Sequence, residues 1–237
     1  MAKIFNVKLT DHQKNILNEI KIDKDVDPFG DYKYENSKWK SFDDKNNIKK
    51  IIFDGIKETS SKNSDKICND ASKIISKLIV SSIKKLKKNM NINEYHKIFW
   101  LRFERPDNRF KIPRWHADGP YISTNEKKMI ISLQGKGTLI AKCKNNKKIL
   151  QDIKKNNRAN PAYVFDEKTN KHIYNEKNEM KNRKLNKSIV ENHCKIYQLN
   201  NFTGVIYEVG NKDNACLHSE PDKTEPRILL GILVSEK

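Results

Sequence analysis

The chain has few cysteines, no long apolar run and a shortage of acidic residues. The four cysteines (Cys68, Cys143, Cys194 and Cys216) stand far apart, and none belongs to a C-x-x-C pair. This spacing disfavours a zinc site or a dithiol redox motif and predicts reduced, mostly structural thiols. No apolar stretch reaches the ~18 residues that a membrane span needs, and the N-terminus lacks an apolar signal region. We therefore expect a soluble, intracellular protein, in the cytoplasm or nucleus, without a membrane partner.

The shortage of acidic residues leaves a large positive charge. Lys and Arg number 48 against 30 Asp and Glu, which gives +18 over 237 residues. Such a field favours nucleic acid or another polyanion as a partner, and a protein partner is also compatible with it. Most of the excess is lysine, accompanied by many Asn and Ile, as an AT-rich genome would produce. Composition bias therefore explains much of the charge without any ligand.

The first part of the chain is helical by pattern. A short helix is expected at Asp11–Ile20, and apolar residues at helical spacing predict two amphipathic helices, at 44–58 and 65–88. Between the first two lies a polar segment with Tyr32, Tyr34 and Trp39, which we expect to be an irregular arm. The lysines that end the third helix could bind phosphates, but complementing the helix dipole is the favoured interpretation. Helices of this kind commonly brace one sheet of a β-sandwich.

The second part of the chain changes to short β-type runs separated by turn residues. Eight runs without alternating helices predict a mainly β (α+β) fold, a double-sheet jelly roll with N-terminal bracing helices, and not a parallel sheet. We expect an N-terminal unit at 1–92 and a jelly-roll domain at 93–237. The predicted strands are Lys97–Phe103, Ile112–Asp118, Lys128–Leu133, Thr138–Cys143, Cys194–Leu199, Gly204–Val209, Ala215–His218 and Arg227–Val234.

A Lys- and Asn-rich segment at about 144–193 interrupts the strand series. It contains two short runs with β character, at 161–165 and 172–174. A compact domain rarely carries so long a connection without purpose. The segment is therefore either a lid that faces the substrate and holds a small hairpin, or a disordered insertion.

Three residues form a candidate metal site. Side chains two apart on an extended strand point the same way, so His116 and Asp118 share one face. His218 would complete a set of two histidines and one carboxylate, the set that binds non-haem Fe(II) and leaves positions open for substrate and O2. Arg227 follows nine positions later, where a guanidinium could form a bidentate pair with a dicarboxylate.

Plainer interpretations exist for each of these residues. H-x-D occurs by chance in many chains, and Arg227 could be a surface cation paired with Glu220 or Glu225. Trp115 and Tyr121 could wall a pocket or simply pack, and Cys216 is treated as a small core residue. The basic series that leads into the motif has Phe103, Phe110 and Trp115 interleaved, which suits a polyanionic substrate and equally a half-buried strand. That series consists of Arg102, Arg105, Arg109, Lys111 and Arg114.

The motif resembles that of the Fe(II)/2-oxoglutarate-dependent oxygenases. The resemblance covers roughly Ile98 to Val234 and is carried by His116-Ala117-Asp118, His218 and Arg227, in the order H-x-D, H, R. It implies a double-stranded β-helix in which His116, Asp118 and His218 bind Fe(II) and Arg227 binds the distal carboxylate of 2-oxoglutarate. Arg227 is followed by Ile and Leu where many members carry a small hydroxylated residue, so the second cosubstrate anchor is unassigned.

The resemblance also implies the reaction. An enzyme of this kind uses Fe(II), 2-oxoglutarate and O2 to hydroxylate or oxidatively demethylate its substrate, and it releases succinate and CO2. The alternative from another class is a non-catalytic, basic jelly-roll module that binds nucleic acid. A metalloenzyme similar to the cupins is disfavoured because the usual extra histidine and glutamate ligands are not evident.

Overall fold

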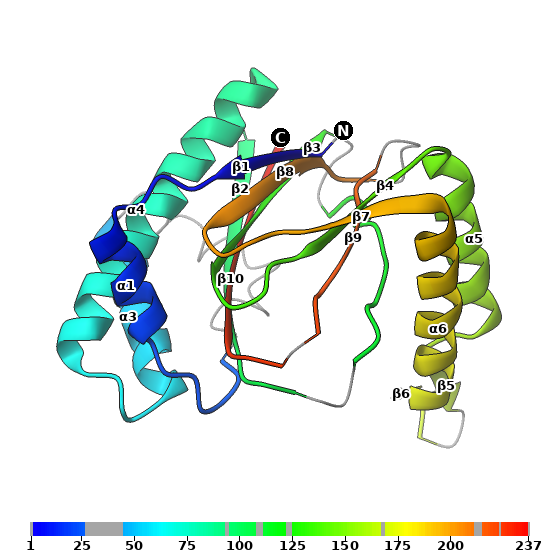
Figure 1. Ribbon diagram of the computed structural model, residues 1–237, viewed down its shortest axis with the longest axis horizontal. Coiled ribbons are helices and arrows are strands. Elements are labelled where there is room, and N and C mark those ends of the chain that lie inside the picture. The colour runs from blue at the N-terminus through cyan, green and yellow to red at the C-terminus, as the bar shows by residue number, and fades with distance from the viewer. Residues whose placement is uncertain are drawn as a thin grey trace.

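Two antiparallel sheets form the centre of the protein, with helices on both sides of them (Figure 1). The computed structural model describes residues 2–26, 45–92, 95–107, 111–121, 125–166, 169–210, 215–222 and 224–236. The predicted arm with Tyr32, Tyr34 and Trp39 lies outside the described residues, as do Arg109 and Phe110 of the basic series. Among the described helices, none is both long enough and apolar enough to cross a membrane.

The larger sheet has five strands, and all its neighbours are antiparallel. Their order is β1-β8-β3-β10-β2, with β3 and β10 near the middle. The strands are β1 (Lys3–Asn6), β2 (Tyr95–Glu104), β3 (Glu126–Gln134), β8 (Thr203–Glu208) and β10 (Arg227–Glu236).

The smaller sheet faces it and has the order β7-β4-β9. Its strands are β4 (Leu139–Cys143), β7 (Cys194–Gln198) and β9 (Leu217–Ser219). The chain crosses between the sheets repeatedly, since β8 lies in the larger sheet, β9 in the smaller and β10 in the larger again. This double-sheet arrangement is the predicted jelly roll, and the fold class is confirmed.

One of the eight predicted strands does not form. In 112–118 only His116 makes a β-bridge, to His218, and the rest has no regular partner. Pro113 has no N–H to donate to a ladder, and Gly119-Pro120 follows the motif directly. The prediction of a full strand at Ile112–Asp118 was therefore wrong, while the extended pairing at His116 itself is present.

Three helices cover the outer face of the larger sheet, as predicted. They are α1 (Asp11–Glu19), α3 (Lys45–Thr59) and α4 (Asp65–Met90). Thr10 and Gln13 form a reciprocal capping box at the start of α1, and Ser64 accepts from the Ile67 N–H at the start of α4. These caps satisfy N–H groups that have no partner within a helix.

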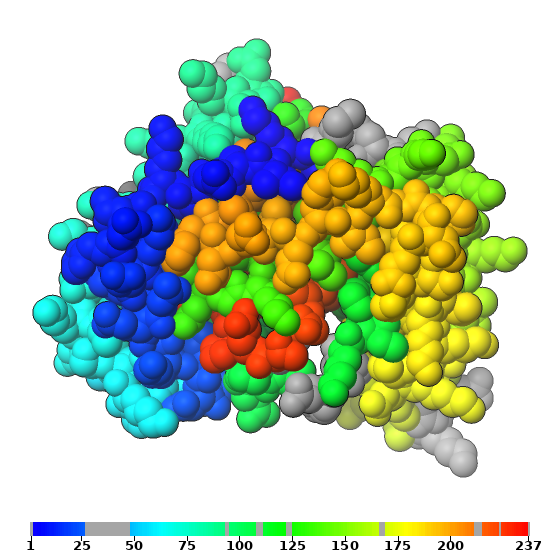
Figure 2. Space-filling model, in the orientation of Figure 1, coloured from blue at the N-terminus to red at the C-terminus, as the bar shows by residue number. Residues whose placement is uncertain are grey.

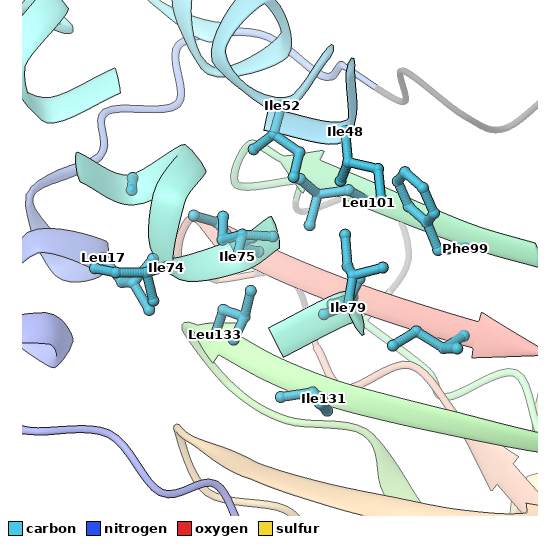
Figure 3. Close-up of a cluster of buried hydrophobic side chains, with 14 of the residues drawn as sticks. Leu17, Ile48, Ile52, Ile74, Ile75, Ile79, Phe99, Leu101, Ile131 and Leu133 are labelled. Atoms are coloured by element: carbon cyan, nitrogen blue, oxygen red, sulfur yellow. The ribbon is translucent and has the colours of Figure 1, made fainter. Parts of the chain in front are cut away.

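Alternation along the strands sorts the side chains between two faces. Leu101 and Ile131 face the helices and pack in one core with Ile75 and Ile79 of α4 (Figure 3). The neighbouring positions belong to a different cluster on the inner face, between the sheets, where Ile130, Leu229 and Leu233 lie with Tyr207. Because successive residues point to opposite faces, residues of even number on β3 and odd number on β10 reach the space between the sheets.

The described residues of the segment at 144–193 are largely helical. The segment contains α5 (Asn146–Ala159), a hairpin of β5 (Tyr163–Asp166) and β6 (Lys171–Tyr174), and α6 (Glu176–His193). The small hairpin was expected and the two helices were not. Their apolar stripe is narrow, and Asn145 and Asn175 cap them, so an Asn- and Lys-rich composition concealed them. The division into units at 1–92 and 93–237 stays a prediction.

A disulfide closes the base of this segment. Cys143 at the end of β4 and Cys194 at the start of β7 are register partners and form a disulfide across 51 residues. The prediction that all four thiols are reduced was therefore wrong for these two, while Cys68 and Cys216 are free and buried. Sequence spacing could not reveal the pair, because only the folding of the whole segment brings its two ends together.

We predict that opening this disulfide destabilises the protein. For the double variant Cys143→Ser/Cys194→Ser, the free energy of unfolding should fall by roughly 2–4 kcal/mol, because the unfolded chain gains the freedom of an open loop. Urea unfolding with and without reductant measures it. Thiol titration of air-oxidised, denatured protein should find only Cys68 and Cys216 reactive, and reactivity of all four cysteines would contradict the assignment.

Candidate metal centre

The three predicted ligands converge. Each of His116, Asp118 and His218 offers one ligand atom, and these atoms all lie within 4.8 Å of one another. The convergence follows from the backbone, because His116 and His218 exchange both N–H to O=C hydrogen bonds, each at 2.9 Å. The two imidazole rings consequently lie side by side, with their centroids 4.4 Å apart.

Hydrogen bonds set the tautomer of both histidines. The Nδ1 atom of His116 lies 2.8 Å from the carbonyl oxygen of Arg114, and the Nδ1 atom of His218 lies 3.0 Å from that of Cys216. A carbonyl oxygen only accepts, so each Nδ1 carries the proton and each Nε2 keeps a lone pair. The Nε2 atoms lie 3.9 Å (His116) and 3.5 Å (His218) from the carboxylate oxygens of Asp118. Support of this kind is typical of histidines that bind metal.

Three proton donors hold the carboxylate of Asp118. Lys128 Nζ lies 2.7 Å from Oδ2, the Tyr207 hydroxyl donates to the same oxygen at 2.8 Å, and the Tyr121 hydroxyl donates to Oδ1 at 2.8 Å. Sequence reasoning named Tyr121 as a neighbour of the motif but missed Lys128 and Tyr207. The alternation of side chains along the strand could have revealed Lys128. It shares a strand face with Ile130 and Ser132 and so points inward.

The charges of the site explain its protonation. Burial alone would raise the pKa of Asp118, but the positive charge of Lys128 and the hydrogen bond that it donates contribute to holding that pKa well below its usual range. Burial is the main cause that lowers the pKa of His218 to about 3, and burial also lowers the pKa of His116. The site thus has one carboxylate and two neutral imidazoles at neutral pH, the protonation state that a metal ion requires.

This donor set fits Fe(II). Two neutral nitrogens and one carboxylate on one side of an ion leave the other side open. No fourth protein ligand joins the cluster among the described residues. The Lys128 ammonium opposes a divalent cation, so an anionic cosubstrate that enters with the metal would relieve the repulsion.

A cavity of about 300 Å³ opens beside the three ligands. Apolar inner-face residues form part of its wall, and Lys128 lies over the Trp100 ring, 4.6 Å from its centroid. Gly231 lets that indole lie flat on β10, because a Cβ atom there would collide with it. The lining includes Ile98, Trp100, Arg102, Arg114, Tyr121, Lys128, Ile130, Thr138, Glu220, Arg227, Leu229 and Leu233, together with the ligands.

Arg227 lines this cavity and is 2% exposed. Its NH1 donates to Glu104 at 3.2 Å and its NH2 to the Thr138 hydroxyl at 3.1 Å, while its Nε is buried without a hydrogen-bond partner among the described residues. The plainer interpretation, a surface cation paired with Glu220 or Glu225, was therefore wrong: Glu220 pairs with Arg114 at 3.1 Å. Thr138 places a hydroxyl beside the guanidinium, and sequence reasoning had no candidate for that position.

The other residues singled out from the sequence have simpler places. Trp115 is buried and packs with residues such as Ile149 and Val190 of the 144–193 segment. Cys216 is a core residue, and burial followed by the charge of Asp118 raises the pKa of its thiol to about 12. Of the basic series, Arg102 and Arg114 line the cavity, whereas Arg105 is an exposed partner of Asp25.

A second cavity, of about 260 Å³, lies between the 144–193 segment and the metal motif. It shares Arg114 and His116 with the first cavity. Arg183 of α6 ties the two parts together, since it donates to Glu179 at 2.7 Å and to the Ile112 carbonyl at 2.9 Å. The other residues that line this second cavity are Trp115, Asn157, Ala162, Glu179, Asn182, Arg183 and Asn186.

Comparison with known proteins found likeness only among solved structures. No family model and no curated protein sequence matches the chain. The chain is similar to EvdO2 from Micromonospora carbonacea var. aurantiaca complexed with 2-oxoglutarate, with 11% identity, a TM-score of 0.39, and coverage of 70% of this chain and 65% of EvdO2. It therefore spans just under two thirds of the length of EvdO2.

Two further solved structures resemble the chain over almost its whole length. The viral collagen prolyl hydroxylase vCPH from Paramecium Bursaria Chlorella virus-1, in a 2OG complex, has 8% identity and a TM-score of 0.37, covering 100% of this chain and 96% of its own. The non-heme iron oxygenase OrfP in complex with Fe has 9% identity and a TM-score of 0.30, covering 96% and 92%.

We predict that the buried imidazole of His218 makes stability depend on pH. Because its pKa is lowered in the folded state, the unfolded chain binds the extra proton below about pH 6.5, and stability falls as the pH falls. For metal-free protein the loss between pH 6.5 and 5 should be roughly 1–2 kcal/mol from this residue. Asp118 does not contribute in this window, since its lowered pKa matters only below the unfolded value of about 3.9.

Urea unfolding at several pH values, in the presence of a chelator, measures this dependence. His218→Gln should flatten it, and His12→Gln, on an exposed position of α1, should leave it unchanged. Equal pH dependence in wild type and His218→Gln would show that His218 is not held neutral.

Proposed function

We propose that the chain is an Fe(II)- and 2-oxoglutarate-dependent dioxygenase that hydroxylates or oxidatively demethylates a substrate. The observation that carries the proposal is the convergence of His116, Asp118 and His218, with both Nε2 lone pairs turned toward one carboxylate. The three ligand atoms, two imidazole nitrogens and one carboxylate oxygen, carry no proton. This set matches the ligands of non-haem Fe(II).

The residues of the chain have separate roles in this proposal. His116, Asp118 and His218 are the metal ligands, and the carbonyls of Arg114 and Cys216 orient the two imidazoles. An Fe(II) ion bound there would activate O2 for the oxidation of a C–H bond of the substrate. This oxidation would be coupled to the decarboxylation of 2-oxoglutarate to succinate and CO2. The apolar residues between the sheets exclude water from the cavity.

Arg227 is proposed to bind the distal carboxylate of 2-oxoglutarate, with Thr138 as the second anchor. The guanidinium is buried, lines the cavity and has an Nε–H with no hydrogen-bond partner in the described part of the chain, which supports an anion as its missing partner. Glu104 accepts from the opposite part of the same guanidinium and fixes its plane. Lys128 adds a positive charge to the site, so the metal and the dianionic cosubstrate should each strengthen binding of the other.

A second candidate is a non-catalytic, basic jelly-roll module that binds nucleic acid. The observation in its favour is that Lys128, Tyr121 and Tyr207 already satisfy the Asp118 carboxylate, without any metal. A module of this kind would bind polyanions, and its affinity for them would not depend on iron or 2-oxoglutarate. The following experiment separates the two candidates.

We predict that succinate forms from 2-oxoglutarate only when Fe(II), O2 and all three ligands are present. Replacing His116, Asp118 or His218 with Ala should reduce turnover by more than the roughly 10–100-fold that loss of an outer partner of a ligand costs. Succinate release by anaerobically purified, iron-loaded protein is the measurement. The control His12→Ala, at an exposed histidine of α1, should turn over like the wild type.

Arg227→Lys tests the cosubstrate anchor within the same assay. It keeps the charge but loses the planar fork, so the KM for 2-oxoglutarate should rise while kcat changes little. Turnover that survives in both His116→Ala and Asp118→Ala, or that is absent from the wild type with iron bound, would refute the oxygenase and favour the second candidate.

A further inference from the structure

Four aromatic rings lie on one exposed face of the β5–β6 hairpin. Tyr163 pairs with Tyr174 and Phe165 with His172 in the strand register, and the ring centroids of the two pairs are 5.5 and 5.4 Å apart. Because residues two apart point the same way, both pairs share a face, and Val164 and Ile173 occupy the other. Tyr163 is 62% exposed and Phe165 50% exposed. The hairpin lies at the far end of α5 and α6 from the disulfide, away from both sheets (Figure 1).

Rings of this size gain nothing from exposure to water. A two-stranded hairpin is weakly stable alone, and exposed clusters of large apolar side chains mark binding surfaces. The rings within each pair are inclined to one another, at 55° and 64°, and a planar group can stack on the exposed face of a ring in either pair. The ring face is therefore suited to a ligand that presents successive planar groups.

The segment that carries this ring face is basic as a whole. At 144–193 it holds 13 Lys and Arg against six Asp and Glu, so it is markedly more basic per residue than the chain as a whole. Lys171 begins β6, and Lys177 and Lys181 follow in the first turns of α6; all three are exposed, as is Glu176 between them. A ligand that extends from the ring face along α6 thus meets three exposed lysines and one exposed carboxylate, a net positive charge that favours a phosphate backbone.

The hairpin also leads to the metal centre. Ala162 immediately precedes Tyr163, accepts the Asn175 N–H at 2.7 Å and lines the second cavity together with His116. Three asparagines of α5 and α6 (Asn157, Asn182 and Asn186) line that cavity. Asn186 donates to Asn157 at 3.1 Å, whereas Oδ1 of Asn182 is buried without a hydrogen-bond partner among the described residues. That oxygen can accept a hydrogen bond from the exocyclic amino group of a base. In Figure 2 the α6 side of the segment (yellow) lies directly beside the stretch of chain that carries the metal motif (green).

We propose that this segment binds single-stranded nucleic acid. Bases stack on the Tyr163, Phe165, His172 and Tyr174 rings, the exposed lysines neutralise the backbone, and the adjoining base enters the amide-lined cavity beside His116. The inference rests on the proposed function for its catalytic meaning, because it names the substrate class of that same site. Binding itself requires neither iron nor 2-oxoglutarate.

Single strands are favoured over a duplex for a physical reason. Bases in a duplex are already stacked on one another, so their faces cannot reach the protein, whereas an unpaired strand exposes them. An acidic peptide would satisfy the lysines but would leave the four rings without planar partners. The experiment therefore includes a duplex of the same length and an acidic polymer.

Fluorescence anisotropy of a short labelled oligouridylate or oligothymidylate, with metal-free protein, tests the proposal. Tyr163→Ala/Phe165→Ala should weaken binding by at least about thirtyfold, the smaller end of what two base–aromatic stacks contribute. The matched control is Val164→Ala/Ile173→Ala, which removes exposed apolar groups from the opposite face of the same hairpin and should bind within about twofold of the wild type. RNA and DNA probes compared side by side show which backbone is preferred.

Three results would overturn the proposal: equal affinity for a duplex of the same length, equal binding by wild type and the ring variant, or displacement of the probe by polyphosphate or poly-glutamate as efficiently as by the unlabelled oligonucleotide. Tyr163→Phe/Tyr174→Phe keeps the rings and should retain binding, so a loss there would indicate misfolding of the hairpin and not loss of stacking.

The outcome is separable from that of the proposed function. Asp118→Ala should lose succinate release and still bind the oligonucleotide, because the ring face contributes no ligand to the metal. The control Val164→Ala/Ile173→Ala should keep both succinate release and oligonucleotide binding. Wild-type protein that turns over but does not bind single strands would refute the ring face as a nucleic-acid site and leave the oxygenase standing.

Discussion

The candidate metal site depends on one pair of backbone hydrogen bonds, those exchanged by His116 and His218. They join two segments that are a hundred residues apart, and they do so where neither segment is a long strand. Each histidine also turns its Nδ1–H to the carbonyl two residues before it. The same local geometry, repeated on both sides of the bridge, leaves the two Nε2 atoms facing the carboxylate of Asp118. The candidate metal site is thus a product of extended backbone more than of side-chain packing.

The larger sheet supports this bridge by separating two environments. Its outer face is covered by α1, α3 and α4 and is entirely apolar in its centre. Its inner face combines apolar residues with charged ones, of which Lys128 pairs with Asp118 and Arg227 with Glu104. Burying a charge is costly unless it is paired. These pairs therefore fix the positions of the groups that surround the cavity.

Sequence reasoning recovered the parts of the structure that depend on local periodicity. An apolar period of 3.6 residues predicts the bracing helices. A period of two residues predicts seven of the eight strands and places His116 and Asp118 on one side of an extended chain. Sequence reasoning missed what depends on distant contacts. Glu104 meets Arg227 only because β2 and β10 are register partners, and Cys143 meets Cys194 only after α5 and α6 have folded back. Pro113 is a further case, since a run with β composition could not pair along its whole length.

The most direct test of the central claim is a crystal structure of the protein grown with Mn(II), which does not consume O2, and 2-oxoglutarate. The account predicts one ion bound by Nε2 of His116, Nε2 of His218 and a carboxylate oxygen of Asp118, with the distal carboxylate of 2-oxoglutarate on Arg227. An ion bound elsewhere, or the imidazole of His218 turned away from the other two ligands with the Lys128–Asp118 pair unchanged, would contradict it.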